Sequence, residues 1–241
     1  MNILSKTILA VAFLALPYTA TAQELSEDRI KELVYEAILE NPDIIMDAVA
    51  IIQQREEAEQ AAATQSVLTD QRVLLEGDPN APVLGNPDGD VTVIEFFDYN
   101  CPFCKRVMPE VQALLEEDTN VRLVYREWPI LGDGSVYAAR AALASRAQGK
   151  YEEFHWALMD ARGRLEEASV LKIAKDIGLD IGQLLTDMQS EDVDEHIETS
   201  MRLAQFLGFN GTPSFVIGDA LLPGFIEQAE LQEYVDQDRE N

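Results

Sequence analysis

Two cysteines separated by two residues, Cys101 and Cys104, are the side chains of this sequence best suited to chemistry, and they are its only cysteines. A C-x-x-C spacing brings two thiols within disulfide distance when the segment forms one helical turn. Such a pair exchanges electrons with other disulfides through a mixed disulfide. Two structural alternatives are weaker: half of a zinc site, for which His155 and His196 lie far away in the sequence, and an inert structural disulfide.

The residues on either side of the cysteines predict a strand followed by a helix. Residues 91–97 form a β-branched and aromatic run, preceded by the turn-rich residues 85–90, which predicts a buried strand. Pro102 suits the first turn of a helix, and apolar residues continue a helical face through residues 107–115. Pro109 is expected to kink this helix because it cannot donate a backbone hydrogen bond.

The order of strand, loop, C-x-x-C and helix gives the two thiols different roles. A thiol at a helix N-terminus faces unpaired N–H groups and the positive end of the helix dipole, which stabilise a thiolate and lower the cysteine pKa. We therefore expect Cys101 to be the attacking thiolate and Cys104, one turn later and deeper, to be the resolving thiol. The sequence predicts no metal and no cofactor beyond the redox-active disulfide that these two residues form.

An acidic residue, Glu95, lies within the apolar strand six residues before Cys101. It is either on a solvated face of the strand or buried at a cost that a function would have to offset. In the buried case it could lie beneath the C-x-x-C and exchange a proton with Cys104. The sequence by itself leaves both alternatives open.

The charge and the first residues of the chain limit where the protein acts. With 44 acidic and 18 basic residues in 241, the net charge of -26 repels phosphate backbones and anionic membrane surfaces, which excludes sequence-independent nucleic-acid binding. Residues 1–22 combine Lys6, a nine-residue apolar run and the small residues Ala20 to Ala22, which predicts a cleaved signal peptide. The run is too short to span a bilayer. We therefore expect a periplasmic protein in an oxidising compartment.

Residues 26–63 carry two amphipathic helical patterns. One apolar stripe extends over residues 30–38 and the other over residues 44–52, with an interruption at Asn41-Pro42. An isolated pair of such helices is marginal in water, so the stripes must pack against something. We expect them to assemble a homo-oligomer, a dimer or a trimer. The alternative is docking on the chain's own catalytic domain.

The segment from Val91 to Pro109 resembles the active-site region of the DsbA-like thiol:disulfide oxidoreductases of the thioredoxin superfamily. In that superfamily an acid commonly occupies the position of Glu95, which implies the buried, proton-accepting role. The segment from Gly211 to Gly218 resembles the loop whose proline is cis and packs beside the C-x-x-C. The resemblance implies this geometry for Pro213.

The same resemblance implies which other residues take part in the reaction. Catalytic contributions are expected from Thr212 and Pro213, in addition to the cysteines and the acid. Contacts with the substrate are expected from Pro102, Phe103 and Gly211.

The resemblance also implies an α/β protein with a thioredoxin fold, an inserted helical domain and an N-terminal helical arm. Strands are expected at residues 121–127, 214–218 and 220–222, and a closing helix at 227–237. The helical insertion is expected at about 133–208.

Three divisions of the chain follow: a signal peptide at 1–22, an oligomerisation arm at 23–70 and a DsbA-like domain at 71–241. Residues 61–70 are expected to form a polar connector. The arm, particularly Glu40 to Met46, is similar to the N-terminal region of ScsC-like and Com1-like exported proteins. In the ScsC-like branch such an arm can mediate trimerisation.

The sequence therefore predicts an exported thiol:disulfide oxidoreductase that acts on protein disulfides through its CPFC dithiol, with disulfide isomerisation as the preferred direction. Its partners would be cysteine-containing substrate proteins, a membrane redox partner and further copies of the chain. The alternatives are a monomeric dithiol oxidase, and a chaperone or copper-tolerance protein that sequesters Cu(I) without turnover, since two soft thiolates suit Cu(I).

Overall fold

A computed structural model describes residues 26–240, apart from a few side chains between residues 57 and 67. The predicted signal peptide lies outside the described residues. The chain divides into two compact units, Met1–Glu56 and Glu57–Asn241, which are treated separately. None of the helices in the described part of the chain combines the length and apolar character needed to cross a bilayer.

The N-terminal unit contains helix α1 (Glu27–Glu40) and the first part of helix α2 (Asp43–Gly77). The Ser26 hydroxyl caps α1 by accepting a hydrogen bond from the Arg29 amide at 3.3 Å. The helices are separated at Asn41-Pro42, where the sequence predicts the interruption. Large apolar side chains of both helices are exposed: Ile30, Leu33, Val34, Tyr35, Leu39, Ile44, Ile45, Met46, Val49, Ile51 and Ile52.

Helix α2 continues through residues 61–70, so the prediction of a polar connector there is wrong. The stretch contains several good helix formers and neither glycine nor proline, and the helix ends only at Gly77. The C-terminal part of α2 also belongs to the larger unit, because Leu68 and Leu75 are buried in one of its two main cores. Burial of these side chains stabilises the helix where its polar composition suggested a linker.

The larger unit is built on a five-stranded sheet in the order β1-β3-β2-β4-β5. The strands are β1 (Val83–Gly85), β2 (Val91–Phe97), β3 (Val121–Glu127), β4 (Ser214–Ile217) and β5 (Ala220–Pro223). β2 and β3 are parallel, whereas the other neighbouring pairs are antiparallel. The sequence predicts β2 to β5 within one residue at each end. It gives no signal for β1, which has only three residues.

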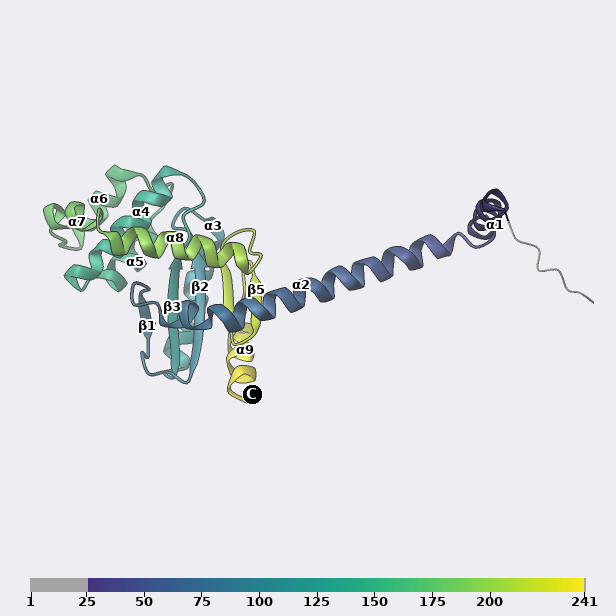
Figure 1. Cartoon of the computed structure of the whole chain (residues 1–241). Helices are drawn as coiled ribbons and strands as arrows, with labels where there is room; N and C mark the ends of the chain where they lie inside the picture. The colour runs from purple at the N-terminus through teal and green to yellow at the C-terminus, as the bar shows by residue number, and fades with distance from the viewer. Residues whose placement is uncertain (1–25, 241) are drawn as a thin grey trace, which may run out of the picture. The chain divides into compact units, whose positions relative to one another are not determined.

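Helices cover both faces of the sheet (Figure 1). On one face lie α3 (Pro102–Glu117) and α9 (Gln228–Glu240), whose apolar side chains join the larger core cluster. Pro109 is inside α3, and the helix continues on both sides of it. On the opposite face lie the C-terminal part of α2 and helix α8 (Glu191–Phe206), which contribute to a second core.

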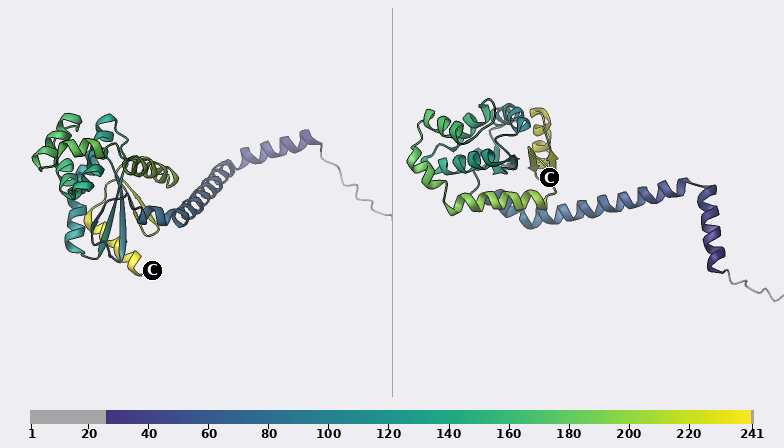
Figure 2. Two further views of the ribbon diagram at one scale, coloured as in Figure 1. Left: turned by 60° about the vertical axis from the view of Figure 1, so that its left-hand side comes forward. Right: turned by 90° about the horizontal axis from the view of Figure 1, so that it is seen from above.

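The chain between β3 and β4 is helical, as expected for the insertion. Its elements are α4 (Asp133–Ala144), the 3-10 helix η1 (Ser145–Gln148), α5 (Tyr151–Asp160), α6 (Glu167–Asp176), α7 (Ile181–Asp187) and then α8. Figure 2 shows α4 to α7 grouped together, with α8 returning across the sheet beside the end of α2. The α/β class with inserted and N-terminal helices is therefore as predicted.

Candidate active site

Cys101 lies at the boundary between the loop that leaves β2 and the first turn of α3. It has an extended backbone at the N-cap position, and Pro102 occupies the first helical position, which tolerates its missing N–H. The free amides of the first helical turn therefore surround the cysteine, as the sequence predicts.

The loop before Cys101 is held by two side chains that the sequence analysis did not single out. The Asp98 carboxylate accepts hydrogen bonds from the backbone amides of Ile130 at 2.8 Å and Leu131 at 2.9 Å. The Asn100 side chain accepts from the Leu165 amide at 2.7 Å and donates to its carbonyl at 3.1 Å. An Asp and an Asn directly before the motif are a turn signal, but their partners are distant in sequence and could not be inferred from it.

The two thiols have very different environments. Both are free thiols; Cys101 is 5% exposed and Cys104 is fully buried. A hydrogen bond from Cys104 lowers the pKa of Cys101 to about 6 against the opposing effect of burial, aided by the Thr212 side chain and the amides of Cys104 and Phe103. Burial raises the pKa of Cys104 well above that of a free thiol. At neutral pH, Cys101 is therefore the thiolate of the pair.

The loop that contains Pro213 lies directly against Cys101. The Thr212-Pro213 peptide bond is cis. The Cys101 Sγ lies 3.2 Å from the Thr212 carbonyl oxygen, to which the thiol donates. A groove of about 550 Å³ extends from this loop to β5 and has a mainly apolar lining that includes Leu221 and Pro223.

The residues expected to contact substrate lie around the same thiol. Pro102 and Phe103 are exposed, the latter with 51% of its surface accessible, and Gly211 is half-buried in the loop beside the groove. Pro102 and Phe103 adjoin Cys101 in the chain, and Gly211 precedes Thr212, whose carbonyl oxygen contacts the Cys101 sulfur, so the structure brings the predicted set together. Their roles toward a substrate remain predictions.

Glu95 is buried, which decides between the two alternatives for its environment. Side chains alternate along β2, so Glu95 shares a face with Val93 and Phe97, which pack in the same core as both cysteines. Burial, together with the charge of Cys101, raises the Glu95 pKa to about 8. Among the described residues no cation forms an ion pair with this carboxyl group, which is consistent with a protonated acid at neutral pH.

A buried tyrosine and histidine extend the polar surroundings of the site. The Tyr99 hydroxyl forms a 3.0 Å hydrogen bond with Nδ1 of His155, whose ring lies 4.3 Å from that of Tyr125. Tyr125 is the cross-strand neighbour of Glu95. Burial lowers the pKa of His155 to about 3, so the imidazole is neutral near pH 7. This histidine packs and hydrogen-bonds beneath the active-site loop and carries no charge there.

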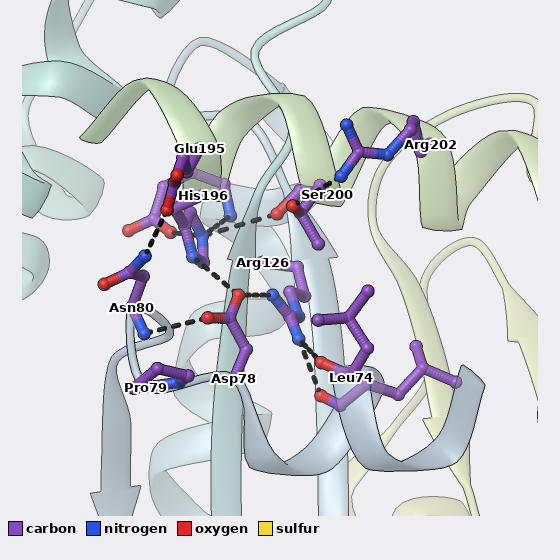
Figure 3. A network of polar contacts seen from close by, with 12 residues as sticks. Leu74, Asp78, Pro79, Asn80, Arg126, Glu195, His196, Ser200 and Arg202 are labelled. Atoms are coloured by element: carbon purple, nitrogen blue, oxygen red, sulfur yellow. Dashed lines mark hydrogen bonds and ion pairs between the residues drawn. The ribbon is translucent and has the colours of Figure 1, made fainter. Parts of the chain in front are cut away.

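A second buried polar cluster lies where α2 ends against β3 and α8 (Figure 3). The fully buried Arg126 pairs with Asp78 at 2.5 Å and donates to the Leu75 carbonyl at 3.0 Å. His196 lies 2.7 Å from Glu127 and 3.7 Å from Asp78. The sequence predicts no role for His196, which is a poor zinc ligand there, and among the described residues no metal-binding group of His, Cys, Asp and Glu is found.

The fold and the site together define the class of protein. A strand that is followed directly by a C-x-x-C at a helix start and pairs in parallel with the next strand, with a cis-proline loop against the first thiol, is the arrangement of a thiol–disulfide oxidoreductase with a thioredoxin fold. The chain belongs to the DsbA-like thioredoxin domain family, whose model matches residues 92–236. The model of the copper resistance protein ScsC N-terminal domain matches residues 27–59.

Solved structures support this assignment. A thioredoxin-like oxidoreductase from Silicibacter pomeroyi DSS-3 is 65% identical, with a TM-score of 0.70 over 70% of this chain and 98% of that chain. A linker-deletion mutant of Proteus mirabilis ScsC is 26% identical, with a TM-score of 0.68 over 91% and 99% of the two chains. A periplasmic thioredoxin-like protein from Salmonella enterica serovar Typhimurium is 29% identical, with a TM-score of 0.65 over 70% and 96%.

Curated relatives also include much longer proteins. A Na(+)/H(+) antiporter NhaA 1 from Salinispora arenicola is 33% identical over 138 residues, which are 56% of this chain and 21% of the relative. The chain thus spans about a fifth of the length of the first curated relatives that it matches.

Proposed function

We propose that this protein is an exported, periplasmic thiol:disulfide oxidoreductase that rearranges disulfides in substrate proteins as a homo-oligomer. The observation that carries the proposal is the asymmetry of the two thiols. Cys101 has a lowered pKa beside the cis-proline loop, and Cys104 is shielded below it. An attacking thiolate and a protected resolving thiol are what exchange through a mixed disulfide requires.

The first step is attack by the Cys101 thiolate on a substrate disulfide. A bond forms between the Cys101 sulfur and one substrate sulfur as the substrate disulfide breaks, and the other substrate sulfur leaves as a thiolate. The groove beside Thr212 and Pro213 would hold the bonded chain, and the exposed ring of Phe103 would offer it a further contact.

The mixed disulfide is then resolved in one of two ways. In isomerisation, the released substrate thiolate attacks another disulfide of the same substrate, and a later attack frees Cys101 as a thiolate with no net electron transfer. In reduction, Cys104 attacks the Cys101 sulfur, which forms the Cys101–Cys104 disulfide and passes two electrons to the substrate. A membrane redox partner would then return the pair to the dithiol.

Glu95 would take the Cys104 proton during reduction. Burial is the larger cause of the raised Glu95 pKa, and the charge of the Cys101 thiolate adds to it. Once Cys101 is in a mixed disulfide, that charge is gone and the Glu95 carboxylate becomes easier to form. The proton acceptor would therefore become available at the stage when Cys104 has to ionise.

The arm supports the oligomeric half of the proposal. Apolar side chains of α1 and α2 are exposed in the single chain, and the match to the ScsC N-terminal domain covers the same helices. Burial of about ten such side chains between copies, at ~1.5–3 kcal/mol each, would outweigh the cost of association. Packing of the same stripes on the chain's own catalytic domain is the alternative.

Copper sequestration is a second candidate function, favoured by the name of the matching N-terminal domain. Two thiolates suit Cu(I). Stoichiometric retention of Cu(I) by a protein that shows no disulfide turnover would support this candidate over the oxidoreductase.

The test combines refolding of scrambled ribonuclease with measurement of the mature protein's mass in solution. The proposal expects recovery of ribonuclease activity, an oligomeric mass, and no recovery with Cys101→Ala. A monomer that oxidises reduced ribonuclease yet leaves the scrambled form unchanged would instead identify a dithiol oxidase.

A further inference from the structure

Arg106, one helical turn after Phe103 in α3, is held between two aromatic rings next to the active site. Its guanidinium carbon lies 4.0 Å from the ring centre of Phe225 and 5.4 Å from that of Phe103. Residues three apart on a helix share a face, so Arg106 and Phe103 lie on the same side of α3. The arginine remains exposed to solvent.

The two rings connect Arg106 to both parts of the site that a substrate must touch. Phe103 lies between the two cysteines in the sequence. Phe225 follows Gly224, whose amide donates a 2.8 Å hydrogen bond to the Pro213 carbonyl. The guanidinium is thus held between a residue of the C-x-x-C segment and the segment that follows β5, which is hydrogen-bonded to the cis-proline loop. Stacking on two rings holds the charge in place and lowers the conformational cost of using it.

Arg106 is one of several basic side chains without an ion pair among the described residues of a chain with net charge -26, and it is the one held by two rings beside the active site. Many basic side chains of the described residues pair with carboxylates, as Arg140 does with Asp194 and Arg239 with Asp90. Among those residues, no carboxylate forms an ion pair with Arg106, whose guanidinium lies against the two rings. An ordered and uncompensated cation is therefore available to a ligand at the rim of the site.

We propose that Arg106 is a specificity-determining residue that favours substrate segments with an acidic residue next to the reacting cysteine. This inference rests on the proposed oxidoreductase function and adds the class of substrate. Because the protein as a whole repels acidic chains, a cation held at the site favours the approach of such segments near Cys101.

The experiment uses three peptides that differ only in having Glu, Gln or Lys beside a single cysteine linked by a disulfide to 2-thiopyridine. Attack by Cys101 on the peptide sulfur breaks that disulfide, forms the Cys101–peptide disulfide and releases 2-thiopyridone, whose absorbance is followed. The full-length reduced protein and its Arg106→Gln, Arg106→Lys and Arg122→Gln variants are compared. Arg122 is the matched control, because it lies at the beginning of β3, at the opposite end of the parallel strands from Cys101.

We expect the rate ratio for the Glu peptide over the Gln peptide to fall about fivefold in Arg106→Gln at low ionic strength, as for loss of a good exposed ion pair. Arg106→Lys should retain part of the preference, and salt should weaken it in the unmodified protein. The Lys peptide should show the opposite trend.

Each other outcome has a defined meaning. An unchanged ratio in Arg106→Gln would overturn the inference while leaving the oxidoreductase function intact. An equal fall of this rate ratio in Arg122→Gln would show that the preference depends on net charge alone, which would also overturn the inference. Absence of 2-thiopyridone release from every peptide, with every variant, would instead contradict the proposed function.

Discussion

At Cys101 and Cys104, one hydrogen bond acts on the two pKa values in opposite directions. The Cys104 thiol donates to the Cys101 sulfur, which stabilises a thiolate on Cys101 and is lost if Cys104 ionises. Once Cys101 is bonded to a substrate, its sulfur is neutral and a far weaker acceptor. Burial is the larger cause of the raised Cys104 pKa and persists, but the contribution of this hydrogen bond is then lost, so formation of the mixed disulfide favours ionisation of the resolving thiol.

The first residue-scale prediction separates the two thiols. Cys101→Ala should abolish thiol–disulfide exchange, whereas Cys104→Ala should still attack and should accumulate mixed disulfides, which non-reducing electrophoresis and mass spectrometry detect. Titration of the thiolate absorbance near 240 nm should give a midpoint of about 6 for Cys101. Full turnover by Cys104→Ala without trapped adducts, or a midpoint at the value of a free cysteine, would show that the roles are wrongly assigned.

The second residue-scale prediction concerns Glu95. Glu95→Gln cannot accept a proton, so resolution of a mixed disulfide in a single turnover should slow by about 100-fold. It should also lose its pH dependence, which in the unmodified protein should be centred below 8, because the Cys101 charge that helps to raise the Glu95 pKa is absent from the mixed disulfide. Glu116→Gln, which removes an exposed acid from the same α3 helix, is the control. Equal resolution rates in the two variants would exclude Glu95 as the proton acceptor.

The raised pKa of Glu95 should also make the stability of the protein depend on pH. The folded protein holds this proton up to about pH 8, whereas the unfolded chain releases it near 4.5. The unfolded state therefore binds fewer protons in this window, and stability falls as pH rises from about 4.5 to 8. Glu95→Gln should flatten that decline in thermal melts measured across the window.

At the scale of elements, regular patterns were readable from the sequence and long-range pairings were not. The apolar run at 91–97 and the C-x-x-C at a helix start predict β2, α3 and the position of Cys101 because period and capping are local properties. β1 is three residues long, too short to show a period. The polar residues after the apolar stripe predict too early an end for helix α2, because the burial of Leu68 and Leu75, which stabilises its later part, depends on the distant sheet.

The ionic cluster beneath α2 was equally hidden from the sequence. Arg126 occurs at the end of a strand, a position at which a charged residue usually indicates solvent, yet it is fully buried. Asp78 and the carbonyls at the end of α2 bind its two terminal nitrogens. Its partner lies 48 residues away in the sequence. Buried ion pairs need such partners, and no local pattern reports them.

The third prediction is that this cluster anchors α2 to the catalytic domain. Asp78→Ala leaves Arg126 buried without its carboxylate and should lower the free energy of unfolding by about 3–5 kcal/mol in urea titrations. Asp219→Ala is the control, since that exposed acid also joins α2 to the domain through Arg72 and should cost less than about 1 kcal/mol. Equal losses would mean that the buried pair contributes no more than a surface contact.

The cluster also predicts a pH dependence. Despite burial, hydrogen bonds from His196, the Asn80 amide and Arg126, together with the charge of Arg126, hold the Asp78 pKa well below 3.8. The contribution of Asp78 to stability is therefore present above pH 3.8 and is lost in acid. Burial alone would lower the His196 pKa, but Glu127 and Asp78 raise it above 6.5. The contribution of His196 to the stability of the fold is complete below pH 6.5, and it is lost as the pH rises through the raised pKa of the histidine. His196→Gln should remove that part of the loss, whereas Glu95→Gln should not.

At the scale of the whole molecule, the division between arm and catalytic domain lies inside one continuous helix. Residues up to Glu56 form one compact unit, and the rest of α2 belongs to the other. The expected boundary at residue 70 would therefore remove Leu68, which is 1% exposed in a core shared with β2, β3 and β4. A truncation meant to test the arm has to end before that residue.

The last prediction compares two truncations of the mature chain. Deletion through Glu56 should give a folded monomer that keeps dithiol exchange, because Cys101, Cys104 and both cores are intact. If isomerisation needs several sites held together, this monomer should lose the ability to rescue scrambled ribonuclease. Deletion through Thr69 also removes Leu68 from its core, which should cost about 2–5 kcal/mol beyond the first truncation.

Sedimentation, ribonuclease rescue and urea unfolding, measured at one protein concentration, distinguish the possible results. An intact protein that sediments as a monomer would contradict assembly through the arm. A monomer truncated at Glu56 that rescues scrambled ribonuclease at the full-length rate would show that the apolar stripes serve only for packing, and docking within one chain would then account for them. Equal unfolding midpoints for the two truncations would show that Leu68 contributes nothing to the domain, against its burial beside the sheet.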